Sequence, residues 1–124
     1  MKVVSTDKAP GAIGPYSQGM IVGGNRFMSS GQIPIDPAVG KIVATTIEDQ
    51  TEQSCKNVEA LLEAAGTSID KVIKTTCFLA DMGDFAAFNE VYAKHFVGKP
   101  ARSCVAVKAL PQGALVEIEV IAEV

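Results

Sequence analysis

The sequence has one histidine, three cysteines and no long hydrophobic run, and each scarcity excludes a class of protein. Because His95 is the only histidine, neither a multi-histidine metal site nor a catalytic scheme with two histidines can be built. The simpler interpretation of His95 is structural, because it falls in the last turn of a predicted helix, where a cation interacts favourably with the helix dipole. We therefore expect no metal and no histidine-based catalysis.

The cysteines and the N-terminus indicate the cellular compartment. Cys55, Cys77 and Cys104 are odd in number, have no C-x-x-C spacing and lie in apolar segments, so we expect reduced thiols in a reducing compartment. No segment approaches the roughly 18 apolar residues of a membrane span, and the N-terminus lacks the apolar stretch of a signal peptide. We therefore expect a cytoplasmic protein.

Charge is scarce as well. Charged residues make up 20% of the 124 residues and hydrophobic residues 48%, whereas an average soluble chain has about 25% charged residues. A single domain over residues 1–124 with so little charge is expected to expose apolar surface, which favours a homo-oligomer. The net charge of -3, without any basic run, makes nucleic acid an unlikely partner.

The first half of the chain predicts a hairpin, a loop and a long helix. Gly23-Gly24-Asn25 separates two apolar runs and indicates a hairpin turn. The proline-containing stretch 33–40 is expected to be a loop that leaves the second strand. Thr45 and Glu48 have the spacing of a capping box, and the apolar residues that follow recur at helical intervals, which predicts a helix over 47–65.

The second half predicts a strand over 69–80, a helix capped by Asp84, and two alternating strands at 102–107 and 116–122. The resulting order of strand, strand, helix, strand, helix, strand, strand is typical of an α+β domain with a mixed sheet. We expect both helices on one face of that sheet. Pro111-Gln112-Gly113 supplies a turn between the last two strands.

Arg102 and Glu117 are the candidates for chemistry. Arg102 opens an apolar strand, where its guanidinium is well shaped to hold a carboxylate through two parallel hydrogen bonds; the alternative is a structural ion pair. Glu117 lies among aliphatic residues, so burial is expected to raise its pKa toward the range useful for proton transfer; the alternative is a solvated sheet face shared with Glu119. If the last two strands pair across the Pro111 turn, Arg102, Cys104, Glu117 and Glu119 share one face, whereas a one-residue slip separates them.

Three further residues have both a functional and a structural interpretation. Cys104 lies near Arg102, which could favour a thiolate, although a small core residue is the simpler interpretation. Tyr16, within GPYSQG, could place a phenol at a pocket rim or simply anchor a loop. Asn89 could contribute to a pocket or be an exposed residue of its helix.

Six stretches of the chain form a combination that is typical of one family. They are KAPGAIGPYSQG at 8–19, SSGQIPIDP at 29–37, EAAG at 63–66, KTTCFLADMGDFAAFNEVY at 74–92, PARSCVAV at 100–107 and VEIEVIA at 116–122. No single string is decisive, but their order within one short domain is specific. Taken together, these stretches resemble the RidA (YjgF-like) family of reactive-intermediate enamine/imine deaminases from end to end.

The resemblance implies a chorismate-mutase-like fold, a homotrimer with active sites in the clefts between subunits, and hydrolysis of 2-aminoacrylate-type enamines and 2-imino acids to 2-keto acids and ammonia without a cofactor. It implies that Arg102 binds the substrate carboxylate, that Glu117 positions or activates water, and that the main chain at Cys104 helps to hold the substrate. Tyr16, Ser30 and Asn89 match the remaining pocket positions of the family.

One departure from the family and two other functions remain open at this point. Lys99 precedes Pro100 where relatives commonly have an aromatic residue, which leaves the side-chain preference of the pocket undefined. An RNA-cleaving translation inhibitor is one alternative function, and the acidic balance of the chain counts against it. A small-molecule-binding or chaperone-like trimer without turnover is the other, because a carboxylate-binding arginine would serve it equally well.

Overall fold

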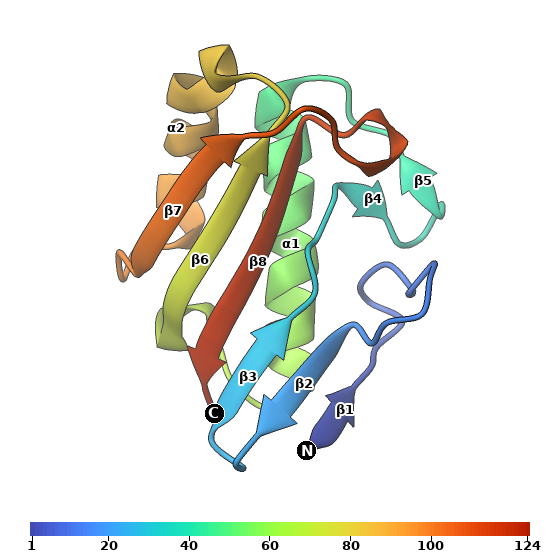
Figure 1. Cartoon of the computed structure of the whole chain (residues 1–124), viewed down its shortest axis with the longest axis vertical. Coiled ribbons are helices and arrows are strands. Elements are labelled where there is room, and N and C mark those ends of the chain that lie inside the picture. The colour runs from blue at the N-terminus through green and yellow to red at the C-terminus, as the bar shows by residue number, and fades with distance from the viewer.

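The computed structural model describes residues 1–124. The chain forms a six-stranded mixed sheet with both helices on one face (Figure 1). The strand order is β1-β2-β3-β8-β6-β7, and all neighbours are antiparallel except the parallel pair β6 and β7. This is the expected α+β architecture. The strands are β1 (Lys2–Val4), β2 (Gly19–Val22), β3 (Arg26–Ser29), β6 (Val72–Leu79), β7 (Ala101–Ala106) and β8 (Val116–Glu123), and the helices are α1 (Ile47–Ala64) and α2 (Phe85–His95).

The predicted hairpin is confirmed, but the loop after it contains more structure than expected. β2 and β3 pair with Val22 opposite Arg26, and Gly23 and Gly24 make the turn with φ of 64° and 74°, which glycine adopts without steric cost. The stretch 33–40, expected to be an irregular loop, contributes β4 (Ile35–Asp36), which pairs with β5 (Lys41–Ile42) in a separate small sheet. A two-residue strand is too short to show the alternation that predicts strands.

Helix α1 occupies the predicted range, but its cap lies one residue later than expected. The N-cap is Thr46, whose hydroxyl accepts a hydrogen bond from the Asp49 backbone N–H at 3.1 Å, so the capping box assigned to Thr45 and Glu48 was wrong. The apolar face of α1 is completely buried against the sheet through Cys55, Val58, Leu61 and Leu62. Complete burial of each aliphatic side chain stabilises the fold by roughly 1.5–3 kcal/mol.

Helix α2 packs an aromatic row onto the end of the sheet. Phe88, Tyr92 and Phe96 are all buried, and the Tyr92 and Phe96 rings stack with their centroids 4.4 Å apart. Asp84 precedes the helix as predicted, but its side chain makes no capping hydrogen bond. Asp81 caps the short turn before it instead, accepting from the Gly83 backbone N–H at 2.8 Å.

The last two strands do not form a hairpin, and this corrects the main geometrical expectation. β6 lies between them, pairing in parallel with β7 and antiparallel with β8. Because Cys77 of β6 is opposite both Cys104 and Ile118, Cys104 and Ile118 share a face and Glu117 projects from the other one. Arg102 and Cys104 therefore point to the helix side and Glu117 and Glu119 point away from it, so the shared face that direct pairing of these two strands would have allowed does not occur.

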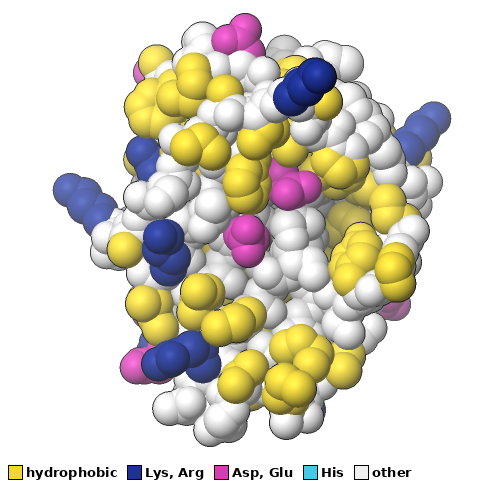
Figure 2. Space-filling model, in the orientation of Figure 1, with side chains coloured by type: hydrophobic (Ala, Val, Ile, Leu, Met, Phe, Trp, Pro, Cys, Tyr) yellow, Lys and Arg dark blue, Asp and Glu magenta, His cyan; other side chains and the backbone are white.

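The face of the sheet opposite the helices, here called the open face, carries hydrophobic side chains around an acidic centre (Figure 2). Met28 and Val105 on this face are 42% and 48% exposed. The side chains that define the open face are Met28, Phe78, Val105, Glu117, Glu119 and Ile121.

Neither α1 nor α2 is long and apolar enough to cross a membrane. All three cysteines are free thiols, as expected.

Candidate functional site

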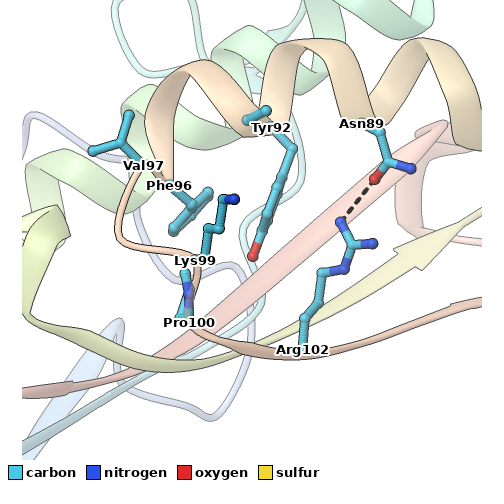
Figure 3. A pocket seen from close by; sticks show the side chains of 8 residues that line it. Asn89, Tyr92, Phe96, Val97, Lys99, Pro100 and Arg102 are labelled. Atoms are coloured by element: carbon cyan, nitrogen blue, oxygen red, sulfur yellow. Dashed lines mark hydrogen bonds between the residues drawn. The ribbon is translucent and has the colours of Figure 1, made fainter.

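Arg102 is held beneath α2 by an amide and by aromatic rings (Figure 3). Its Nη1 donates a 2.8 Å hydrogen bond to Oδ1 of Asn89. Its Cζ lies 4.8 Å from the centroid of the Tyr92 ring and 5.5 Å from that of Phe85, distances at which a guanidinium is attracted to an aromatic face. The side chain is thus positioned without any opposite charge.

The absence of an opposite charge distinguishes the two interpretations of Arg102. The only side-chain ion pairs in the structure are those of His95 with Glu52 and Glu59, so the structural ion pair considered for Arg102 does not exist within this chain. A guanidinium has five N–H donors, and Asn89 is the single side-chain acceptor that Arg102 contacts. The remaining donors are available to a planar anion such as a carboxylate.

These donors border a pocket of about 510 Å³ between α2 and the turn that precedes β7. Asn89 and Tyr92 come from α2, while Lys99 and Pro100 come from the turn. The volume falls within the roughly 300–1,000 Å³ of small-molecule sites. Nothing in the sequence indicated that Tyr92 lines a pocket, because its spacing within an aromatic row indicates only core packing. Lys99 was noted only as a departure from the family pattern.

Tyr92 lines the pocket, and its hydroxyl is held in place by a residue of the sheet. Its hydroxyl is 2.7 Å from Oγ1 of the buried Thr75. Burial raises the pKa of Tyr92, and the Thr75 hydrogen bond and Arg102 only partly oppose this effect. The phenol therefore stays protonated at neutral pH and provides a rigid surface beside the guanidinium.

Cys104 lies two residues along β7 from Arg102, on the same face. Partial burial raises the pKa of its thiol, and the nearby Arg102 charge only partly offsets this effect. The thiol is consequently not activated as a nucleophile. β7 is the last strand of the sheet, so one side of its backbone has no strand partner and leaves peptide N–H and C=O groups free to bind a ligand.

Glu117 projects from the open face and packs against Gly31. The backbones of Gln32 and Ile118 exchange hydrogen bonds of 2.8 and 3.2 Å, which brings Gly31 beside Glu117. A Cβ at Gly31 would lie 2.6 Å from Cδ and Oε2 of Glu117, so only glycine leaves room for the carboxylate in this position. Burial and, secondarily, the charge of Glu119 raise the pKa of Glu117, the direction expected from its aliphatic neighbours.

Ser30 and Tyr16 lie near Glu117 in the loops that border it. Ser30 donates a 2.6 Å hydrogen bond through Oγ to the Ser17 carbonyl, and Tyr16 lines a small cleft together with Gly31. The anchor of this region is Gln18, which sequence reasoning left without a role. Its amide nitrogen donates to three carbonyls, the shortest bond being 2.7 Å to Pro10, and its oxygen accepts from the Thr6 N–H.

The structure thus brings the predicted site residues together in two groups rather than one. Arg102, Asn89 and Cys104 lie on the helix side of β7, whereas Glu117, Ser30 and Tyr16 lie at the open face and its border. β8 is two strands from β7, a lateral separation of roughly 10 Å. A small imino acid cannot reach both groups within a single chain.

His95 takes no part in either group. It ends α2, as predicted, and its two ring nitrogens lie 2.8 Å from Glu59 and 2.9 Å from Glu52, both on α1. A neutral imidazole has one N–H, so donation to both carboxylates requires the protonated ring. The histidine is a charged link between the helices.

Comparison with known proteins agrees with this architecture. A protein-family model described as "Endoribonuclease L-PSP" matches residues 6–124. A RutC family protein of Pyrococcus horikoshii is 54% identical over 122 residues, covering 98% of this chain and 96% of the relative. The mouse 2-iminobutanoate/2-iminopropanoate deaminase is 48% identical over 122 residues, covering 98% of this chain and 90% of its own. The crystal structure of Escherichia coli TdcF with bound serine superposes with a TM-score of 0.94 at 45% identity, covering 100% of this chain and 99% of that one.

The fold is therefore that of the small α+β proteins related to L-PSP, with a pocket that contains Arg102 beside the last strand of the sheet. The chain belongs to the RidA (YjgF-like) family.

Proposed function

We propose that this protein is an enamine/imine deaminase that hydrolyses 2-imino acids to 2-keto acids and ammonia. The observation that carries the proposal is the Arg102 guanidinium, held in an open pocket by Asn89 and aromatic rings with no carboxylate partner. The naming of a 48% identical mouse relative as a 2-iminobutanoate/2-iminopropanoate deaminase supports it. So does the bound serine in the TdcF structure, since serine has both a carboxylate and an amino group.

The active site in this proposal is completed by a second copy of the chain in a homotrimer. Arg102 and Glu117 project from opposite faces of one sheet, about two strands apart. A partner subunit whose open face covers the β7 edge could bring its own Glu117, Ser30 and Tyr16 to the Arg102 pocket. The exposed apolar side chains of the open face favour such an association.

The chemistry needs only positioning and one proton relay. Arg102 holds the carboxylate of the 2-imino acid, and the free backbone of β7 at Cys104 fixes its orientation. Glu117 accepts a proton from water as the water oxygen adds to the imine carbon, and it returns this proton to the imine nitrogen, which gives a carbinolamine. Glu117 then transfers the carbinolamine hydroxyl proton to the amino nitrogen, the C–N bond breaks as the C=O bond forms, and the products are ammonia and the 2-keto acid. An enamine enters the same route after tautomerising to the imine.

The raised pKa of Glu117 suits this relay. A carboxylate with an ordinary pKa is a weak base near neutral pH, whereas a partly buried one with a raised pKa accepts a proton from water more readily and is still acidic enough to return it to nitrogen. No cofactor or metal is assigned to the reaction, because the imine carbon of the substrate is already electrophilic.

The test is an assay in which an amino-acid oxidase releases a 2-imino acid in the presence of semicarbazide, which traps the imine. Added protein should reduce the amount of trapped imine in proportion to its concentration. A structured RNA incubated in parallel tests the ribonuclease suggested by the family description. RNA cleavage without any effect on imine trapping would replace this proposal by the ribonuclease, and binding of keto acids without either activity would indicate a non-catalytic binding protein.

A further inference from the structure

The pocket beneath α2 contains a second cation, Lys99, in addition to Arg102. Figure 3 shows the Lys99 side chain turned toward α2, with Tyr92 standing between it and Arg102 in this view. No acidic residue lines the pocket. Neither cation takes part in an ion pair, because the only ones in the structure belong to His95.

The backbone at Lys99 is in an unusual conformation. Its φ is 52°, one of two positive values among the non-glycine residues, and its N–H is bound to the Phe96 carbonyl at 3.1 Å. Left-handed backbone is unfavourable for a residue with a Cβ. The neighbouring Gly98 could adopt it freely but does not. Strain of this kind at the rim of a pocket is a reason to look for a functional role for the side chain.

Two unpaired cations in one pocket repel each other, and a ligand with two negative charges relieves that repulsion while pairing both. Their chemistry also differs. Arg102 offers a planar fork that matches a carboxylate, whereas Lys99 offers a mobile point charge on a flexible stem, which can follow a second carboxylate at the end of a chain. A volume of about 510 Å³ leaves space beside the smallest imino acids for such a chain.

We propose that this pocket selects 2-imino acids with a second carboxylate, with Arg102 binding the carboxylate next to the imine and Lys99 binding the side-chain carboxylate. This rests on the proposed deaminase function and specifies its substrate class. The reaction is unchanged and redox-neutral: water adds to the imine carbon, the C–N bond breaks, and a 2-oxo dicarboxylate and ammonia leave.

The experiment compares two ligands with the same five-carbon chain, one with and one without the second carboxylate. Binding of 2-oxoglutarate and 2-oxopentanoate is measured by calorimetry, and turnover is measured with the 2-imino acids formed from glutamate and norvaline. The variants are Lys99→Met, which removes the charge but keeps most of the length of the side chain, and Lys99→Gly, which removes the charge and also suits the positive φ. Lys56→Met, at an exposed position of α1 outside the pocket, is the matched control for loss of one positive charge.

We expect the wild type to bind 2-oxoglutarate about tenfold more tightly than 2-oxopentanoate, the scale of one favourable charge pair in a partly desolvated site. Both Lys99 variants should lose that preference while binding 2-oxopentanoate as before, and Lys56→Met should keep it. Equal affinity of the wild type for the two ligands would overturn the inference, as would an equal loss of both ligands in the Lys99 variants. A Lys99-dependent preference in binding without turnover of either imino acid would support the ligand class and reject the deaminase function.

Discussion

At the scale of single residues, Arg102 has the most demanding geometry. Its guanidinium is fixed by Asn89 and by the Tyr92 ring, and its remaining donors are unused. Arg102→Lys keeps the charge but removes the planar fork and its aromatic stacking. We expect a loss of about 2 kcal/mol in transition-state binding, or roughly 30-fold in kcat/KM on 2-imino acids, with little change in the melting temperature.

The measurement for Arg102→Lys is steady-state turnover beside thermal melting and particle mass. Near-normal kcat/KM would remove Arg102 from the site. A joint loss of activity and assembly would assign it a structural role instead.

The Cys104 thiol illustrates a residue whose position matters more than its chemistry. Partial burial raises the pKa of the thiol, so little thiolate exists at neutral pH. Cys104→Ser should therefore retain kcat/KM within about threefold, because the backbone of β7 that we assign to substrate binding is unchanged. Complete loss of turnover in a folded and correctly assembled Cys104→Ser variant would show that the thiol itself reacts.

Gly31 determines where the Glu117 carboxylate lies. In Gly31→Ala the new Cβ would be 2.6 Å from the end of the Glu117 side chain. That flexible end can move, so we expect a small change in stability but at least a tenfold loss of kcat/KM, about 1.4 kcal/mol or more, because misplaced catalytic groups are costly. Gly11→Ala, where a Cβ meets nothing within 4 Å, is the control, and equal activity of both variants would argue against a catalytic Glu117.

At the scale of secondary-structure elements, the contact between α1 and α2 depends on pH through His95. Partial burial alone would lower the pKa of His95, but its hydrogen bonds to and the charges of Glu52 and Glu59 outweigh this effect and raise it. A pKa raised on folding stabilises the native state below the unfolded value of about 6.5 and loses that contribution as the pH rises through the folded value. The helix that carries Asn89 and Tyr92 should thus be held less firmly in alkaline solution.

This expectation is tested by urea unfolding of the wild type and His95→Gln between pH 6 and pH 9. The difference in unfolding free energy between the two proteins should be largest at pH 6 and shrink as the pH rises. Taking the difference removes the contribution of the other groups that titrate in this range. A difference independent of pH would show that folding does not raise the pKa of His95, and a difference that grows as the pH rises would show that folding lowers it.

At the scale of the whole molecule, the proposed homotrimer depends on the open face. Sedimentation at micromolar concentration should give three times the 13.0 kDa chain mass. Val105→Glu places a charge among the exposed apolar side chains of this face and should yield a monomer with unchanged helix content and no turnover, since burying an unpaired charge costs several kcal/mol. Val39→Glu, at an exposed position between β4 and β5 that is 54% exposed, should remain trimeric; a monomeric wild type would contradict the proposal.

Most of the local structure could be predicted from the sequence alone. Helical spacing predicted α1 and α2, Gly23-Gly24-Asn25 predicted the β2–β3 turn, and the aliphatic neighbours of Glu117 predicted its raised pKa. These properties depend on residues close together in the chain. The exact cap of α1 and the two-residue strands β4 and β5 were missed, because signals spread over one or two residues are ambiguous.

The relative position of the two groups of candidate site residues depends on the tertiary structure and could not be predicted. The alternation of residues within a strand shows which of them share a face, but it gives no information about which other strand lies beside that strand. The insertion of β6 between β7 and β8 turned Arg102 and Glu117 to opposite faces, and the turn before β7 brought Lys99 to the Arg102 pocket. Strand order results from the packing of the whole chain, so the separation that calls for a partner subunit could not be read from the residues themselves.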